Sequence, residues 1–201
     1  FDPNSGEKDL VSNGIEFGGF NGLNDLAFDS GGNLYLTDQG SSGLEDPHGR
    51  VFRLRKTGEL DLLLDGLPLP NGLVLDVNEK NLYVSLTRSN QIISVPLSKD
   101  FDLIKRSRMF IQMSGSPTGP DGMAVDTKDN LVVVHAGFGT VWVFSQFGEP
   151  LYRIKSAAGM RTTNVAYGGE DLRTLFITEA EQGVILSVAL PDPGVVLYSH
   201  R

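Results

Sequence analysis

Four short, oxygen-bearing side chains recur along the chain at intervals of about 40 to 50 residues. They are Asn24, Asn71, Asp121 and Asn164, and each opens a short segment of mainly apolar residues. Amide and carboxylate oxygens are the ligands that hard divalent cations prefer, and the chain has no cysteine to offer a thiolate. If the fold brings the four side chains together, they form a cation site, with Ca²⁺ as the first choice and Mg²⁺, Mn²⁺ or Zn²⁺ as alternatives.

A turn is the competing interpretation of two of these positions. Asn71-Gly72 and Asp121-Gly122 are dipeptides typical of two-residue β-hairpin turns. Two observations favour a ring of ligands instead. The preceding segments, residues 67–70 and 116–120, contain prolines and are poor partners in a strand ladder. In addition, Asn24 and Asn164 occupy the same place in the repeat without a following glycine.

The elements that must position these residues are short and rich in Val, Ile, Leu, Tyr and Phe, and Gly, Asn, Asp or Pro bounds them. This pattern is typical of β-strands, and no segment has helical periodicity. After each of the four residues, a second, a third and a weaker fourth apolar segment follow. They lie at 33–38, 49–54 and 59–64; at 81–85, 90–95 and 108–113; at 130–135, 139–144 and 150–154; and at 174–178, 183–188 and 195–198.

Four strands per unit and a period in the forties predict an all-β fold, a β-propeller of four-stranded antiparallel blades. The repeats start near residues 24, 71, 121 and 164 of a single domain over residues 1–201. A β-sandwich does not explain four similar units. The first strand of a blade lines the central channel, so the four oxygen-bearing residues should converge at one mouth of it. The second segments are continuously apolar, so both faces of those strands should be buried.

The N-terminal part of the chain predicts a fragment of a further blade. Residues 10–15 read as a fourth strand that precedes the first complete unit, so about four and a fraction blades are expected, with N-terminal blades missing. A true four-bladed propeller is the alternative.

Other polar residues carry weaker signals. His135 ends a second strand and should reach the same mouth, so it is a candidate substrate contact together with Asn164; a structural histidine is the alternative. Asp29, Asp76 and Asp126 recur after the first strands and are expected to open turns. The chain has no Gly-x-Ser-x-Gly motif and no Gly-rich phosphate loop, so neither a serine triad nor a nucleotide site is indicated.

The composition excludes several classes of partner. Lys and Arg number 17 against 25 Asp and Glu, which gives a net charge of −8 and argues against nucleic-acid and anionic-membrane partners. No apolar run approaches the roughly 18 residues of a membrane span. With no cysteine and no recognisable signal peptide, we expect a bacterial cytoplasm rather than secretion, and a monomer or small homo-oligomer. Glycine is abundant, at 24 residues, which indicates many tight turns.

Segments spread over nearly the whole chain carry a family resemblance, and their order and spacing make it specific. They are residues 24–29 and 32–38, 67–73, 120–126, 135–142 and 162–169. Together they resemble the senescence-marker-protein/gluconolactonase/luciferin-regenerating-enzyme family, especially its microbial lactonases. The resemblance implies a six-bladed propeller, of which this chain is the C-terminal two-thirds.

The resemblance also implies a site and an activity. Asn71 and Asp121 match the family's metal-binding Asn and Asp, and Asp121 also matches its general base. Asn24 matches an Asn that is a ligand in some relatives and a substrate contact in others. The remaining ligand, a Glu of the first blade, has no counterpart here, and Asn21-Gly22-Leu23 replaces the Arg-containing segment of animal members.

We therefore expect a divalent-metal-dependent hydrolase that opens a sugar-type or related small-molecule lactone, with Asp121 as the catalytic base. Phosphotriester hydrolysis by the same metal site is one alternative. A non-catalytic propeller that binds a partner through its loops is another. A metal-independent condensing enzyme, similar to strictosidine synthase, is a third.

Overall fold

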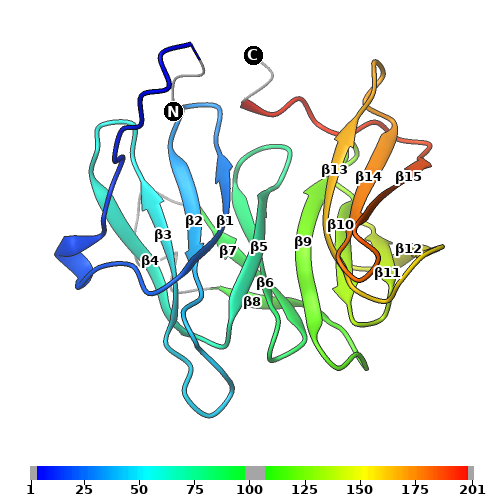
Figure 1. Cartoon of the computed structure of the whole chain (residues 1–201), viewed down its shortest axis with the longest axis horizontal. Helices are drawn as coiled ribbons and strands as arrows, with labels where there is room; N and C mark the ends of the chain where they lie inside the picture. Colours follow the sequence, from blue (N-terminus) through cyan, green and yellow to red (C-terminus); the bar gives the residue numbers. More distant parts are fainter. Residues whose placement is uncertain (1–3, 98–106, 199–201) are drawn as a thin grey trace.

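The structure, a computed structural model, describes residues 4–97 and 107–198, and its strands form four antiparallel sheets (Figure 1). The first sheet holds β1 (Leu23–Phe28), β2 (Leu34–Asp38), β3 (Gly49–Leu54) and β4 (Leu60–Leu67). The second holds β5 (Pro70–Leu75), β6 (Asn81–Leu86), β7 (Gln91–Pro96) and β8 (Arg108–Gln112). The third holds β9 (Gly119–Val125), β10 (Leu131–Ala136), β11 (Thr140–Phe144) and β12 (Pro150–Lys155). The fourth holds β13 (Thr162–Gly168), β14 (Thr174–Glu179) and β15 (Val184–Ala189).

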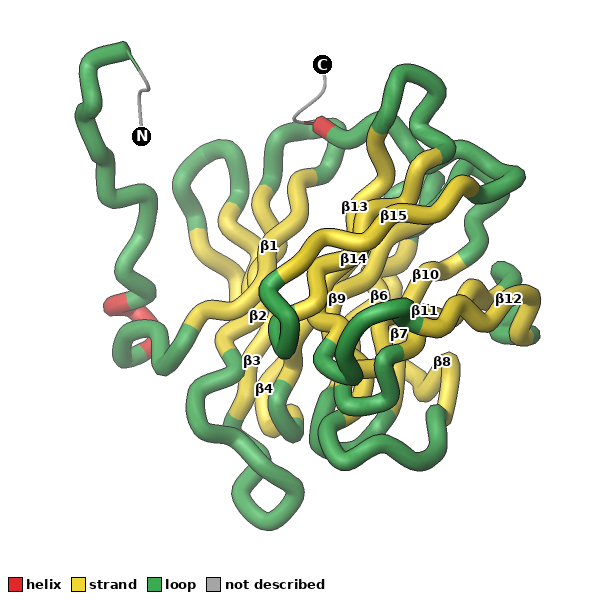
Figure 2. Tube along the Cα trace, turned by 45° about the vertical axis from the view of Figure 1, so that its right-hand side comes forward, coloured by secondary structure: helices red, strands yellow, loops and turns green. Residues whose placement is uncertain are grey.

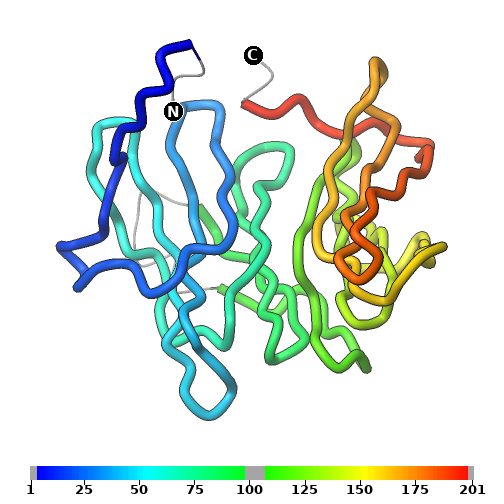
Figure 3. Tube along the Cα trace, viewed as in Figure 1, coloured from blue at the N-terminus to red at the C-terminus, as the bar shows by residue number. Residues whose placement is uncertain are grey.

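The chain completes each sheet before it starts the next, as the colour sequence in Figure 3 shows. The first strands of consecutive sheets are neighbours: β1 lies beside β5, β5 beside β9, and β9 beside β13. The loops gather at the two ends of the strands (Figure 2). This arrangement confirms the expected β-propeller, in which the first strand of each blade faces a common channel.

The hydrophobic core is divided into layers that lie between consecutive sheets. One cluster joins the first and second sheets and includes Val51 and Val84, which are both fully buried. A second cluster joins the second and third sheets through residues such as Ile92 and Val133. A third joins the third and fourth sheets, with Leu175 at its centre. Each sheet is thus fixed against its neighbour by apolar burial, the dominant favourable term in folding.

The burial of the second strands depends on whether a sheet has a neighbour on both faces. β2, β6 and β10 are buried at almost every position, as their continuously apolar sequences predicted. β14 instead alternates between buried and exposed residues, because the fourth sheet packs against only one other sheet. Its outer face exposes Phe176 and Ile185, and at the other end of the series β1 exposes Leu26 and Phe28.

Two expected elements are not strands. Residues 4–14 form no strand, and the segment continues into a short 3-10 helix, η1 (Ile15–Phe17), so the predicted fragment of a further blade is wrong for the described residues. Phe17 and Phe20 pack against Phe52 and cover the outer face of the first sheet instead. Within the described residues, no helix is long and apolar enough to cross a membrane.

The predicted fourth strand of the last blade, residues 195–198, is also wrong. After β15 the chain leaves its sheet and crosses the third sheet, where the Val195 N–H donates to the carbonyl of Val125 (3.3 Å). It then reaches the first sheet, where the Tyr198 ring stacks on that of Phe28 with centroids 5.3 Å apart. This C-terminal tail therefore connects the two ends of the sheet series (Figure 1).

The predicted turn-opening role of the recurring aspartates is confirmed. Each carboxylate accepts a 2.7 Å hydrogen bond from an asparagine side chain at the end of the same turn. The pairs are Asp29 with Asn33, Asp76 with Asn81, and Asp126 with Asn130. All three aspartates are buried, and main-chain N–H groups of the turn fill their remaining acceptor positions.

Candidate functional site

Each first strand carries a β-bulge at the position that the sequence repeat selected. The register of β1 against β2 shifts between Leu23 and Leu26, and that of β5 against β6 between Pro70 and Leu73. The same irregularity lies in β9 opposite residues 133–135 of β10, and in β13 between Thr162 and Asn164. A bulge re-aims the side chains of the residues that it contains, and bulges are frequent next to active sites. Asn24, Asn71 and Asp121 therefore share one structural position at the same end of three neighbouring strands. In β13 this position is held by Thr163, so the predicted place of Asn164 is wrong by one residue. Asn164 instead takes the place of Asp25: the N–H of each donates to the threonine opposite, Thr178 or Thr37.

The glycines after Asn71 and Asp121 are required by close packing and not by turns, so the hairpin interpretation is wrong. Gly72 lies inside β5 and Gly122 inside β9, and neither has a positive φ. A Cβ atom at Gly72 would lie 2.3 Å from the carbonyl oxygen of Asp121, a contact that real Cβ atoms do not make. The absence of a side chain at this position is what lets neighbouring first strands approach closely enough to bring their bulges together.

Asp121 and Asn71 meet in this arrangement. The Asp121 side chain is partly buried, and its pKa is raised to about 6 by this burial and by the negative charge of Asp25. The main-chain N–H of Gly122 and the side-chain amide of Asn71 approach the carboxylate and lower its pKa, without cancelling the other effects. The two residues that the sequence assigned to a metal site thus lie side by side, although they come from different sheets.

Asp25 is a site residue that the sequence analysis missed. Its carboxylate accepts hydrogen bonds from the N–H of Leu26 (2.9 Å) and, across the sheet boundary, from the N–H of Leu73 (3.2 Å). Burial raises its pKa, and its charge acts on Asp121. One signal could have found it. Asp25 occupies the place in the repeat where the next two units have glycine, so it is the one carboxylate in that row.

Asn164 lies at the other side of Asp121. Its side-chain oxygen accepts a hydrogen bond from the N–H of Val165 (2.8 Å) and lies against Gly122, where a Cβ would come within 2.0 Å of it. Asn24 lies in the bulge of β1, one position earlier in the repeat than Asn164, and both asparagine side chains are exposed. The ring thus has two partly buried members, Asn71 and Asp121, between two exposed ones, Asn24 and Asn164. The side-chain amides of Asn24 and Asn164 are therefore accessible to a small molecule.

His135 is not brought together with these residues. It is 1% exposed in β10 and lines a separate small cavity with Met113 and Trp142. Burial lowers its pKa; the Gly115 carbonyl opposes this shift, although neither ring nitrogen has a hydrogen-bond partner of good geometry among the described residues. His135 lies at the bulge end of β10, where it pairs with Pro120, but its imidazole is buried and Phe138 of the adjacent loop packs edge-on against it. This burial favours the structural alternative, and the substrate contact stays a prediction.

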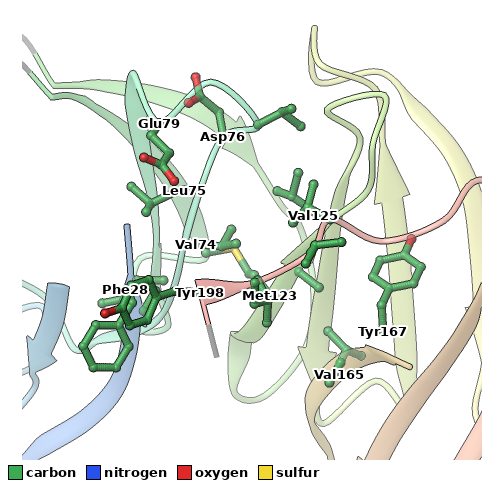
Figure 4. A pocket seen from close by; sticks show the side chains of 18 of the residues that line it. Phe28, Val74, Leu75, Asp76, Glu79, Met123, Val125, Val165, Tyr167 and Tyr198 are labelled. Carbon is green, nitrogen blue, oxygen red and sulfur yellow. The ribbon is translucent and has the colours of Figure 1, made fainter. Parts of the chain in front are cut away.

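The channel itself contains a cavity of about 580 Å³ whose walls are the first strands. Most of its lining is apolar, and Figure 4 shows Val74, Met123 and Val165 among the side chains that face it. Asp25 and Asn164 also line it, so the cavity begins at the oxygen-bearing ring. The C-terminal tail, with Tyr198, forms part of the wall. The arrangement could accept a small molecule with a polar end at the ring and a less polar body in the channel.

The donor set at the ring fits a hard divalent cation. Its potential ligands are the Asp121 carboxylate and the amide oxygens of Asn24, Asn71 and Asn164, with the Asp25 charge nearby. Among the described residues no group of three or more His, Cys, Asp or Glu side chains is placed to hold a metal, so amides must supply most of the oxygens. A cation at this place would offset the repulsion between Asp25 and Asp121 that raises the Asp121 pKa.

Comparisons with known proteins show the family to which the chain belongs. The family model described as the SMP-30/Gluconolactonase/LRE-like region matches residues 1–181. The chain belongs to this family. A gluconolactonase of Zymomonas mobilis is 33% identical in an alignment 199 residues long, which covers 91% of this chain and 55% of that enzyme. A pentonolactonase of Haloferax volcanii is 26% identical, over 79% of this chain and 53% of that enzyme.

Solved structures have the same fold. A gluconolactonase of Xanthomonas campestris superposes with a TM-score of 0.70 at 26% identity, over 86% of this chain and 58% of that one. Regucalcin of Agrobacterium tumefaciens, described as a calcium-binding protein, gives a TM-score of 0.74 at 21% identity, over 87% of this chain and 63% of that one. The chain thus spans about half the length of the curated relatives that it matches.

Proposed function

We propose that this family member contributes the ring and channel of a divalent-metal-dependent lactonase, which opens sugar-type or related lactones by hydrolysis. The observation that carries the proposal is the meeting of Asn71 and Asp121 at the end of an open channel, with Asn164 and Asp25 beside them. The two similar enzymes named above act, by their names, on gluconolactone and on pentonolactones, which are small cyclic esters.

The roles of the residues follow from their exposure and charge. Asp121 is the base that takes a proton from the attacking water, because it is the carboxylate of the ring and a positioned carboxylate can serve as a general base. Asn71 holds the Asp121 carboxylate in place through its amide. Asn24 and Asn164, whose amides are exposed, bind the oxygen atoms of the lactone and orient its carbonyl group.

The proposed cation is Ca²⁺, held by the side-chain oxygens of Asn71 and Asp121 with help from Asn24. When bound, it would polarise the lactone carbonyl and stabilise the negative charge that develops on its oxygen. Amide and carboxylate oxygens without nitrogen or sulfur ligands favour Ca²⁺ or Mg²⁺ over softer metals. The ring supplies only part of a six- to eight-oxygen shell, so water or further protein oxygens must complete it.

A substrate panel tests the proposal. Glucono-1,5-lactone, a pentonolactone, an aliphatic γ-lactone and a phosphotriester are assayed with Ca²⁺ and with a chelator. We expect one of the lactones to be hydrolysed with Ca²⁺ and to lose most of its turnover with the chelator. Turnover of the phosphotriester alone would reassign the substrate class. Absence of all turnover, with no effect of Ca²⁺ on thermal unfolding, would contradict the proposal and favour a non-catalytic binding module.

A further inference from the structure

One residue of each second strand lies opposite the bulge of the first strand. The strand pairing places this residue between two paired neighbours in the first three sheets, and opposite Asn164 in the fourth. These bulge-facing residues are Thr37, Ser85, Val134 and Thr178. Three of the four carry a hydroxyl group, and Thr37 and Ser85 are fully buried.

The Thr37 hydroxyl joins the first sheet to the second at the ring. It accepts a hydrogen bond from the Asp25 N–H of its own sheet (3.1 Å) and donates one to the main-chain carbonyl of Asn71 in the next sheet (2.7 Å). Asp25 holds the same stretch of β5 from its other side, through the N–H of Leu73 (3.2 Å). Two side chains of the preceding sheet, Thr37 and Asp25, thus form hydrogen bonds to the bulge that carries Asn71.

The Ser85 hydroxyl repeats this connection one sheet further on. It donates to the main-chain carbonyl of Asp121 (2.9 Å), and the carbonyl oxygen of Gly72 lies 3.3 Å from the same hydroxyl oxygen. Thr87 adds a second hydroxyl, which donates to the carbonyl of Pro120 (2.8 Å). Two consecutive carbonyls of the β9 bulge therefore have their hydrogen-bond donors in the second sheet.

The last two units show what the hydroxyl does in the bulge. In the fourth sheet, the Thr178 hydroxyl accepts from the Asn164 N–H (2.9 Å) and lies 3.3 Å from the Asn164 carbonyl, so it serves its own bulge. In the third sheet the bulge-facing residue is Val134, whose side chain cannot form a hydrogen bond to the next sheet. The main chain of Asn164 is bonded instead by Thr178 of its own sheet. A hydroxyl from the preceding sheet thus bonds the main chain of the two partly buried ring residues, Asn71 and Asp121.

We propose that Thr37 and Ser85 are positioning residues, which set the side chains of Asn71 and Asp121 by holding the main-chain carbonyls of those same residues; this inference rests on the proposed function. A bulge removes a carbonyl from the strand ladder, and a buried carbonyl without a ladder partner needs another hydrogen-bond donor. The position of that donor therefore sets the direction of the carbonyl. The carbonyl and the side chain of one residue move together about its backbone dihedrals. An error of about 1 Å in a catalytic group can lower turnover about 100-fold.

Isosteric and conservative variants test this role. Ser85→Ala and Thr37→Val remove the hydroxyls, whereas Ser85→Thr and Thr37→Ser keep them. Thr140→Val is the matched control, because the Thr140 hydroxyl is equally buried but has its partners within its own blade. It donates to the Phe138 carbonyl (3.1 Å) and accepts from the Lys155 ammonium group (3.1 Å). We expect Ser85→Ala to lower kcat about 10- to 100-fold with KM within about twofold, and Ser85→Thr to restore kcat. Thr140→Val should keep the kcat of the unmodified protein.

Two further readouts separate this inference from the proposed function. The increase in Tm on adding Ca²⁺ should be smaller in Ser85→Ala and Thr37→Val than in Thr140→Val, whatever the substrate. Crystal structures of Ser85→Ala and of the unmodified protein, in one crystal form, should show the Asp121 carboxylate displaced. The inference would be overturned if the Asp121 carboxylate did not move in Ser85→Ala. It would also be overturned if Ser85→Ala lost no more kcat than Thr140→Val does. If the protein hydrolyses no lactone, the proposed function is contradicted. The Tm increase with Ca²⁺ and the crystal structures still decide the role of Ser85.

Discussion

A Cβ atom on Gly122 would come within 2.0 Å of the side-chain oxygen of Asn164, so the third and fourth blades touch at the site through a residue without a side chain. The second and third blades touch in the same way, through Gly72 and the carbonyl of Asp121. These two contacts set how closely the oxygen-bearing residues approach one another. The geometry of the ring is therefore a property of the packing between blades.

Gly72→Ala should destabilise the protein by about 1–3 kcal/mol and abolish most of the activity. The added methyl group meets the backbone of Asp121, which cannot rotate away as a side chain could. Chemical denaturation and kcat measure the two effects. Gly43→Ala is the matched control, because a Cβ there would meet nothing within 4 Å and its φ is not positive. Equal stability of the two variants would contradict the close approach.

Asp121→Asn should lower turnover by about 100- to 10,000-fold while the fold is kept. The substitution removes the proposed base, and it also removes the repulsion from Asp25 that disfavours a charge at this place. Its Tm without metal should therefore equal or exceed that of the unmodified protein. Asp65→Asn, at an exposed position in β4, controls for loss of a charge. Near-normal lactonase activity of Asp121→Asn would rule out its catalytic role.

Calcium should stabilise the folded protein through linkage, by about 2.7 kcal/mol at a free concentration 100 times its Kd. Differential scanning fluorimetry with increasing Ca²⁺, and after chelation, measures the effect. The stabilisation should be lost in Asp121→Asn and kept in Asp65→Asn. A Tm that is the same with chelator and with Ca²⁺ would remove the metal from the proposal.

His135→Leu should leave activity unchanged and should maintain or raise the free energy of unfolding. The imidazole is buried without a hydrogen-bond partner of good geometry among the described residues, and an unsatisfied buried polar group is destabilising. The repeat already accepts leucine there, since Leu86 pairs with Pro70 as His135 pairs with Pro120. Steady-state kinetics and urea unfolding check both statements. A large loss of kcat/KM would restore His135 as a substrate contact.

Asp61 should make stability depend on pH at the acid end. Burial raises its pKa, but hydrogen bonds from Arg55 and Arg53 outweigh burial and hold the pKa below its usual value of 3.8. Its contribution is therefore complete above that value and is lost as the pH falls through the folded-state pKa. The difference in unfolding free energy between the protein and Asp61→Asn should be larger at pH 7 than at pH 3. Glu59→Gln, in a more exposed pair with Arg55, should show little change.

A comparison of particular residues with their predicted positions shows which features were predictable from the sequence. The strands were predictable because apolar runs and turn residues are local signals, and Asn71 and Asp121 were found because the repeat aligns them. Asp25 was missed because its partners, Leu73 and Asp121, are distant in the chain. The position of His135 along its strand was predictable, whereas the burial of its imidazole under the loop that carries Phe138 was not. The strand predicted for residues 195–198 failed because the tail pairs with the third sheet rather than the fourth.

The sequence by itself determined the all-β class, the four repeated units and, in Asn71 and Asp121, two side chains of the site. Each of these depends on periodicity and residue type within one unit. Only the tertiary structure decided how these side chains form a site, because this depends on contacts between units that no local pattern records. Gly72 and Gly122 have the composition of turns, and the neighbouring blade makes them points of close approach. Ser85 has the composition of an ordinary strand residue, and the next blade makes it the donor to Asp121.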